Sequence, residues 1–176
     1  MSGLGHLLAD SLSRVTDQAV SSDARTVRVG LLGCGNVGGA LVPLLRAQRD
    51  AIAARTGLNL VVTSVAVRNM SRDRGVELGD ASLTNDAMAL VSDPEIDVVV
   101  EVIGGIEPAR ELIVAALSSG KPVVTGNKEL LANHGAELFE LADSNEVDLL
   151  FEAAVAGGIP LIRPLRESLR GEPVSR

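Results

Sequence analysis

The chain has 176 residues, a net charge of −7 and 46% hydrophobic residues, and Phe139 and Phe151 are its only Phe, Tyr or Trp residues. This length suits one domain or slightly more, with an aliphatic core. The acidic balance and the lack of a Lys/Arg cluster argue against nucleic acid as a partner, and no apolar run approaches the roughly 20 residues that span a bilayer. The single cysteine, Cys34, excludes an internal disulfide and fits a reducing compartment. Because no secretory leader is visible either, we expect a cytoplasmic protein without membrane contact.

Residues 1–25 stand apart from the rest of the chain. Leucine and valine recur there at helical spacing as far as Val15, which predicts a short amphipathic helix, and Ser21 to Asp23 break the pattern. We interpret this segment as an N-terminal extension, a leader helix or a tail, and place the main domain at residues 26–176.

A β-branched, apolar run leads directly into three glycines, Gly33, Gly35 and Gly38, and an apolar helical pattern follows. In this strand–turn–helix setting the first glycine allows the tight turn, the second lets a pyrophosphate approach the backbone, and the third lets the helix pack against the strand. The helix N-terminus adds free N–H groups and the positive end of the helix dipole. The pattern predicts a dinucleotide-binding loop, and a glycine-rich turn without a ligand is the alternative.

Apolar strands and helices alternate along the remaining sequence. Strands are predicted at 27–32, 59–67, 96–102, 122–125 and 147–151, helices at 37–55, 86–91, 108–119, 128–144 and 160–170, and a variable stretch at 68–86. Gly57 stands where a C-cap glycine would end the first helix. Such alternation predicts βαβ units with a parallel sheet, and near-continuous Val, Leu and Ile strands fit a sheet covered on both faces. The predicted fold class is α/β, a Rossmann-type parallel sheet with helices on both faces.

Arg68 ends the second predicted strand, where NAD-specific domains carry an acidic residue that binds the ribose 2′-hydroxyl. No Asp or Glu stands at this strand end, and Asn69, Arg72 and Arg74 follow. Because an arginine suits a 2′-phosphate, the sequence favours NADP over NAD as the cofactor. The alternative is a solvated basic loop.

Lys128 follows a potential N-cap residue, Asn127, and so lies in the first turn of a predicted helix. A cation there opposes the helix dipole. The position also follows the strand at 122–125, and ligands bind at the carboxyl ends of strands in open α/β sheets. Lys128 could donate to a substrate hydroxyl or carboxylate or contact the cofactor, and an ordinary surface lysine is the alternative.

The segment EAAVAGGIP (152–160) follows another strand end. If the chain is extended from Val155, the carbonyl groups of Val155, Gly157 and Ile159 point the same way. Together with the region of Glu152 they could form an oxygen cage for a hard cation. The residues alone favour a plain βα turn.

Five motifs together resemble the N-terminal, NAD(P)-binding part of homoserine dehydrogenase. They are GLLGCGNVGG (30–39), VAVRN (65–69), VVVEVIGGIEPAR (98–110), KPVVTGNKELLA (121–132) and EAAVAGGIPLIRPLRESLRG (152–171). The resemblance implies reversible hydride transfer between NAD(P)H and aspartate 4-semialdehyde, giving homoserine, in the synthesis of threonine, methionine and isoleucine. The partners implied are therefore small molecules, and the full-length protein is expected to be a homo-oligomer.

The resemblance also implies site residues. A catalytic role falls on Lys128, and the implied nucleotide contacts are Gly33, Gly35, Asn36, Val37, Gly38, Arg68, Gly104 and Lys128. A monovalent cation such as sodium is implied at Glu152, Val155, Gly157 and Ile159.

The substrate domain of the family would lie beyond Arg176. We therefore expect a fragment that binds nucleotide weakly and is inactive by itself. Two other functions stay open, namely a redox-sensing or regulatory Rossmann module without catalysis, and another small-molecule NAD(P)-dependent dehydrogenase.

Overall fold

A computed structural model describes residues 24–155 and 159–168, which form a six-stranded parallel sheet in the order β3-β2-β1-β4-β5-β6. The strands are β1 (Arg25–Leu32), β2 (Leu58–Ala66), β3 (Ser82–Thr84), β4 (Val98–Glu101), β5 (Val123–Thr125) and β6 (Leu149–Leu150). The helices are α2 (Asn36–Ala47), α3 (Arg49–Thr56), α4 (Ala87–Ser92), α5 (Ala109–Ser118), α6 (Lys128–Ser144), the short 3₁₀ helix η1 (Glu152–Ala154) and α7 (Ile162–Ser168). This strand order is that of the Rossmann fold, so the predicted fold class is confirmed.

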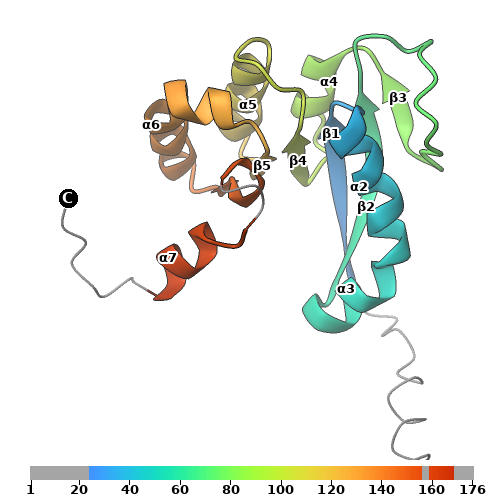
Figure 1. Ribbon diagram of the computed structural model, residues 1–176, viewed down its shortest axis with the longest axis horizontal. Coiled ribbons are helices and arrows are strands. Elements are labelled where there is room, and N and C mark those ends of the chain that lie inside the picture. The colour runs from blue at the N-terminus through green and yellow to red at the C-terminus, as the bar shows by residue number, and fades with distance from the viewer. Residues whose placement is uncertain (1–23, 156–158, 169–176) are drawn as a thin grey trace, which may run out of the picture.

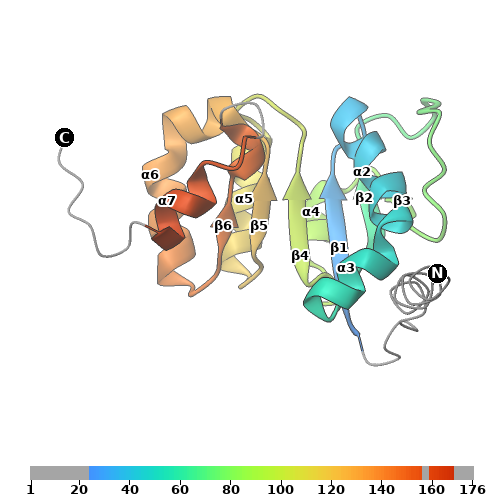
Figure 2. The same ribbon diagram turned by 60° about the horizontal axis from the view of Figure 1, so that its bottom comes forward.

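Helices cover both faces of the sheet. Figure 2 shows α2 and α3 in front of the strands and α4 and α5 behind them. Successive side chains of a strand point to opposite faces, and so Leu31 packs with Val42 of α2 while Leu32 belongs to the larger core formed with α4, α5 and α6. Both leucines are fully buried. The apolar strands thus supply two cores, as a doubly covered parallel sheet requires.

The first predicted helix, 37–55, is two helices in the structure. Its chain bends at Gln48, which is at once the C-cap of α2 and the N-cap of α3. The two helices differ in character, because α2 buries Val42 and two glycines whereas α3 buries only Ala53. Gly57 ends α3 in the left-handed conformation, with φ of 69°, as predicted for a C-cap glycine.

Strand β3 was not predicted. It has three residues within the stretch expected to be variable, and among the described strands it pairs with β2 alone. The other element boundaries differ from the predicted ones by a few residues, which is common at element ends. The helix predicted as far as Val15 lies wholly outside the described residues. Of the predicted extension, residues 1–25, only the last two positions are described, and β1 begins at Arg25.

All six strands point the same way, so the loops after β1, β4 and β5 lie at one edge of the sheet (Figure 1). Such an edge is where open α/β sheets bind ligands. Within the described residues, no helix is both long and apolar enough to cross a membrane.

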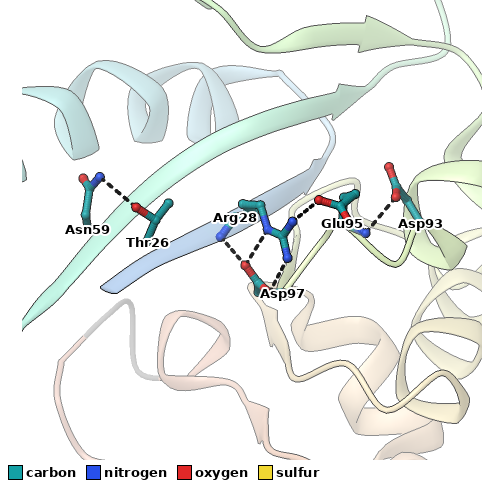
Figure 3. Close-up of polar contacts among 6 residues, drawn as sticks. All are labelled: Thr26, Arg28, Asn59, Asp93, Glu95 and Asp97. Carbon is teal, nitrogen blue, oxygen red and sulfur yellow. Dashed lines mark hydrogen bonds and ion pairs between the residues drawn. The ribbon is translucent and has the colours of Figure 1, made fainter. Parts of the chain in front are cut away.

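Near the amino end of β4, Arg28 of β1 forms ion pairs with Asp97 and Glu95 (Figure 3). Its backbone N–H donates to Asp97 Oδ2 at 2.7 Å, and its guanidinium donates to both carboxylate oxygens, at 2.9 Å from Nε and 3.0 Å from Nη2. Glu95 forms a second ion pair with the same guanidinium. The guanidinium and the backbone N–H of Arg28 lower the pKa of Asp97 to about 2.

Candidate functional site

The glycine loop after β1 is too tightly folded for side chains at two of its three glycines. Gly33 has φ of 98°, and a Cβ there would lie 3.1 Å from the backbone carbonyl group of Val102. A Cβ on Gly38 would lie 2.1 Å from the carbonyl oxygen of Gly33. The first glycine therefore allows the turn and the third allows close packing of α2 against the loop, as the sequence predicts.

Gly35, the second glycine, faces open space. A Cβ added there would meet nothing within 4 Å. Gly35 is the N-cap of α2 and provides no side-chain hydrogen bond, and the next two residues, Asn36 and Val37, are exposed. The first N–H groups of a helix have no partner within it, so those of α2 are available to an anion in this open space.

Two other helices with N-termini at this edge are capped by their own side chains. Asp86 Oδ1 accepts a hydrogen bond from Ala89 N–H at 2.8 Å at the start of α4, and Asn127 Oδ1 accepts one from Leu130 N–H at 3.1 Å at the start of α6. The uncapped start of α2 therefore distinguishes it from α4 and α6.

A closed ring of hydrogen bonds joins the loops after β4 and β5. The carboxylate of Glu101, the last residue of β4, is fully buried. Its Oε1 accepts from the N–H groups of Ile103 at 2.7 Å and Gly104 at 3.2 Å, and its Oε2 accepts from Thr125 Oγ1 at 2.5 Å.

Asn127 closes this ring. Its N–H donates to Thr125 Oγ1 at 3.0 Å, and its Nδ2 donates to the carbonyl oxygen of Gly105 at 2.6 Å. Gly104 and Gly105 both have positive φ, at 80° and 74°, so this loop geometry favours glycine at both positions. The ring consequently fixes the Gly104–Gly105 loop against the start of α6.

Lys128 and Arg68 extend from this edge with free charged groups. Lys128 is the first residue of α6, and Arg68 follows the end of β2 by two positions. Both residues are exposed, and neither side chain makes a hydrogen bond or an ion pair with any residue in the described ranges. Arg74 behaves differently, because its guanidinium donates to the carbonyl oxygens of Arg72 and Asn69.

Glu152 lies after β6, and both its carboxylate and its carbonyl oxygen accept hydrogen bonds. Its two carboxylate oxygens accept from Ile162 N–H at 3.1 Å and Arg163 N–H at 3.0 Å, which caps the start of α7. Its carbonyl oxygen accepts from Val155 N–H at 3.3 Å. Gly157 lies outside the described residues. Within the described part of the chain, no group of three His, Cys, Asp or Glu side chains could hold a metal ion.

A cavity of about 300 Å³ lies elsewhere, between the C-terminal half of α2, β2 and the segment around Leu78 and Asp80. None of the residues that line it belongs to the glycine loop or to the ring of Glu101. It is therefore separate from the candidate nucleotide site.

A family model described as the NAD-binding domain of homoserine dehydrogenase matches residues 33–152. The chain belongs to this family. The homoserine dehydrogenase of Mycobacterium tuberculosis is 48% identical over 154 residues, which cover 88% of this chain and 34% of that protein.

Solved structures agree with this assignment. A homoserine dehydrogenase from Thiobacillus denitrificans has a TM-score of 0.78 and 48% identity, over 83% of this chain and 34% of the other. A hyperthermophilic archaeal homoserine dehydrogenase in complex with NADPH has a TM-score of 0.68 and 31% identity, over 83% of this chain and 50% of the other. The chain spans about a third of the length of the curated relatives that it matches.

Membership of the homoserine dehydrogenase family confirms the resemblance drawn from the five motifs. The parallel sheet places the loop residues predicted as nucleotide contacts, together with Arg68 and Lys128, at one edge. Glu101 was not among the residues predicted for the site. The available signal was a carboxylate near the end of the apolar strand predicted at 96–102, three residues before the Gly104–Gly105 pair.

Proposed function

We propose that the edge between β1 and β4 binds NAD(P)(H) and that this chain is the nucleotide-binding part of a homoserine dehydrogenase. The observation that carries the proposal is the uncapped start of α2, which adjoins the open space in front of Gly35. Family membership supports the same ligand. In the reaction, hydride passes between C4 of the nicotinamide and the aldehyde carbon of aspartate 4-semialdehyde, giving homoserine.

The proposed nucleotide contacts divide between phosphate and ribose. The N–H groups at the start of α2 would bind the pyrophosphate, and Gly104 would border the cofactor from the loop after β4. The residues assigned to these contacts are Gly33, Gly35, Asn36, Val37, Gly38 and Gly104. Arg68 would pair with a 2′-phosphate, since it is exposed and has no partner among the described residues. This favours NADP over NAD, and the NADPH bound to the archaeal relative supports that preference.

Lys128 is proposed as the catalytic residue of this part of the protein. Its position at the start of α6 would let its ammonium group contact cofactor and substrate and deliver or relay a proton to the substrate oxygen. In the full-length protein that carries the substrate domain, we expect Lys128→Met to lower the rate of homoserine-dependent NADP⁺ reduction about 100-fold, the lower end of the usual range for general acid–base assistance. An unchanged rate would exclude Lys128 from catalysis.

The segment from Glu152 to Ile159 is proposed to hold a monovalent cation such as sodium through main-chain carbonyl oxygens. Carbonyl oxygens are the ligands that hard cations prefer. Each carboxylate oxygen of Glu152 accepts one hydrogen bond from the start of α7, and its carbonyl oxygen accepts one from Val155 N–H. Each of these oxygens therefore retains a lone pair that a cation could use. The proposal predicts a higher melting temperature in sodium than in tetramethylammonium at equal ionic strength, and equal values would refute it.

A pair of glycine substitutions tests the nucleotide site. Gly35→Ala places a methyl group in the space assigned to the pyrophosphate and meets no protein atom within 4 Å. We expect the fold to persist and NADPH affinity, measured by fluorescence titration, to fall about tenfold or more, or at least about 1.4 kcal/mol. The matched control is Gly135→Ala on α6, where the added Cβ makes only an ordinary contact with Phe139 at 3.7 Å. Equal affinity of Gly35→Ala and the control would contradict the proposed site.

A further inference from the structure

We propose that Glu101 is a positioning residue that locks the loop after β4 and the start of α6 into one arrangement, so that Gly104 and Lys128 face the same bound nucleotide. The inference rests on the proposed function, because it assigns Glu101 a task in that site. Glu101 itself is fully buried behind the two loops and contributes no surface to a ligand.

The two oxygens of the carboxylate serve different loops. Oε1 accepts from two successive N–H groups of the loop after β4, whereas Oε2 accepts from the hydroxyl of Thr125 at the end of β5. An ionised carboxylate is the side chain that can accept from three donors at once without donating. The donors around Glu101 therefore match a carboxylate better than an amide of the same shape.

Asn127 connects this hydrogen-bonded ring to Lys128. The hydroxyl of Thr125 accepts from Asn127 N–H, and Asn127 both donates to the carbonyl of Gly105 and caps α6. Thr125 and Asn127 are buried at 0% and 4% exposure, so water competes little for these bonds. Lys128 is the next residue, and its backbone position is set by this ring.

Buried hydrogen bonds to a charged group are costly to break on one side only, because the remaining partner is left unsatisfied. Loss of one member should therefore loosen both loops together. A carboxylate with a purely local role would affect only the loop that follows β4.

The test uses the whole chain and three substitutions. Thr125→Val removes the hydroxyl that joins the two halves of the ring, Thr125→Ser keeps it, and Glu101→Gln removes the charge. We expect NADPH affinity to fall about tenfold in Thr125→Val and Glu101→Gln and to stay within about twofold of the wild type in Thr125→Ser. Glu140→Gln, an exposed site on α6, serves as the control for loss of a negative charge and should bind like the wild type.

Amide resonances of the nucleotide-free variants supply a second measurement. In Thr125→Val the signals of Gly104 and Leu130 should both shift, and in Thr125→Ser both should stay close to the wild-type positions. Shifts confined to one loop, or unchanged NADPH affinity in folded Thr125→Val and Glu101→Gln, would contradict the proposed role of Glu101. Either result would leave the proposed nucleotide site intact. If the wild type does not bind NADPH, the proposed function fails and this inference fails with it.

Discussion

Near the amino end of β4, Arg28 meets Asp97 and Glu95, whereas at the carboxyl edge Arg68 and Lys128 meet no described partner. Arg28 lies on β1 and Asp97 just before β4, whereas Arg68 follows β2 and Lys128 follows β5. These four strands are neighbours in one sheet. One region satisfies its charges within the fold, whereas the other leaves its cations and the first N–H groups of α2 without a partner in the described part of the chain. The difference separates charges that stabilise the fold from charges that are available to a ligand.

The largest expected effect is on stability, from Gly38→Ala in the glycine loop. The new Cβ would lie 2.1 Å from the carbonyl oxygen of Gly33, so α2 and the loop must separate. We expect a loss of about 3 kcal/mol in the free energy of unfolding, the upper part of the usual range for overpacking. Urea denaturation measures it, with Gly135→Ala as the control that should be neutral or slightly stabilising. An unchanged midpoint would mean that the loop can open enough to accept the methyl group without strain.

The next largest effect, also on stability, comes from the ion pairs of Arg28. Asp97→Asn should lower the free energy of unfolding at neutral pH by about 1 kcal/mol, the upper end for a partly exposed ion pair. The folded-state pKa of Asp97 is about 2, below its usual value of 3.8. Its contribution is therefore full above about pH 4 and is lost as the pH falls toward 2.

Denaturation of wild type and Asp97→Asn at several pH values checks this assignment. The stability difference should be constant from pH 7 to about 4 and should shrink below that. Glu95→Gln is the matched control, because the Glu95 side chain is 75% exposed and should add little. A difference that persists unchanged at pH 2 would show that the Asp97 carboxylate does not act through its charge.

The smallest expected effect concerns cofactor preference. Arg68→Ala should weaken NADPH binding about fivefold, the value of a single exposed ion pair, and should leave NADH binding unchanged. Titration of both nucleotides against both proteins measures this. Equal losses for the two nucleotides would place Arg68 away from the 2′-phosphate.

Local patterns in the sequence were sufficient to predict most elements. The glycine loop, the C-cap at Gly57 and the helix that begins at Lys128 each depend on neighbours within a few residues. The break at Gln48 was not predictable in the same way, because neither a glycine nor a proline marks it in the sequence. The backbone hydrogen bonds also continue through it, from Gln48 N–H to the carbonyl of Leu44 and from Ile52 N–H to the carbonyl of Gln48. Strand β3 was missed because three residues are too few to show a period.

The site was predictable where it is made of contiguous motifs and not where it depends on tertiary contacts. The hydroxyl that pairs with Glu101 is 24 residues further along the chain, and the N–H groups that bind the Glu152 carboxylate are 10 and 11 residues away. No sequence period connects residues at such distances. The availability of Arg68 and Lys128 likewise appears only when the partners of the neighbouring side chains are known.

A titration of the ¹⁵N-labelled chain with NADPH, followed by amide resonances, tests the central claim most directly. We predict that signals from Gly35 to Gly38 and of Gly104 shift in proportion to nucleotide binding, while those of Arg28 and Asp97 stay in place. Saturating nucleotide without shifts at the glycine loop, or shifts centred on Arg28 and Asp97, would contradict the claim that the carboxyl edge between β1 and β4 is the nucleotide site.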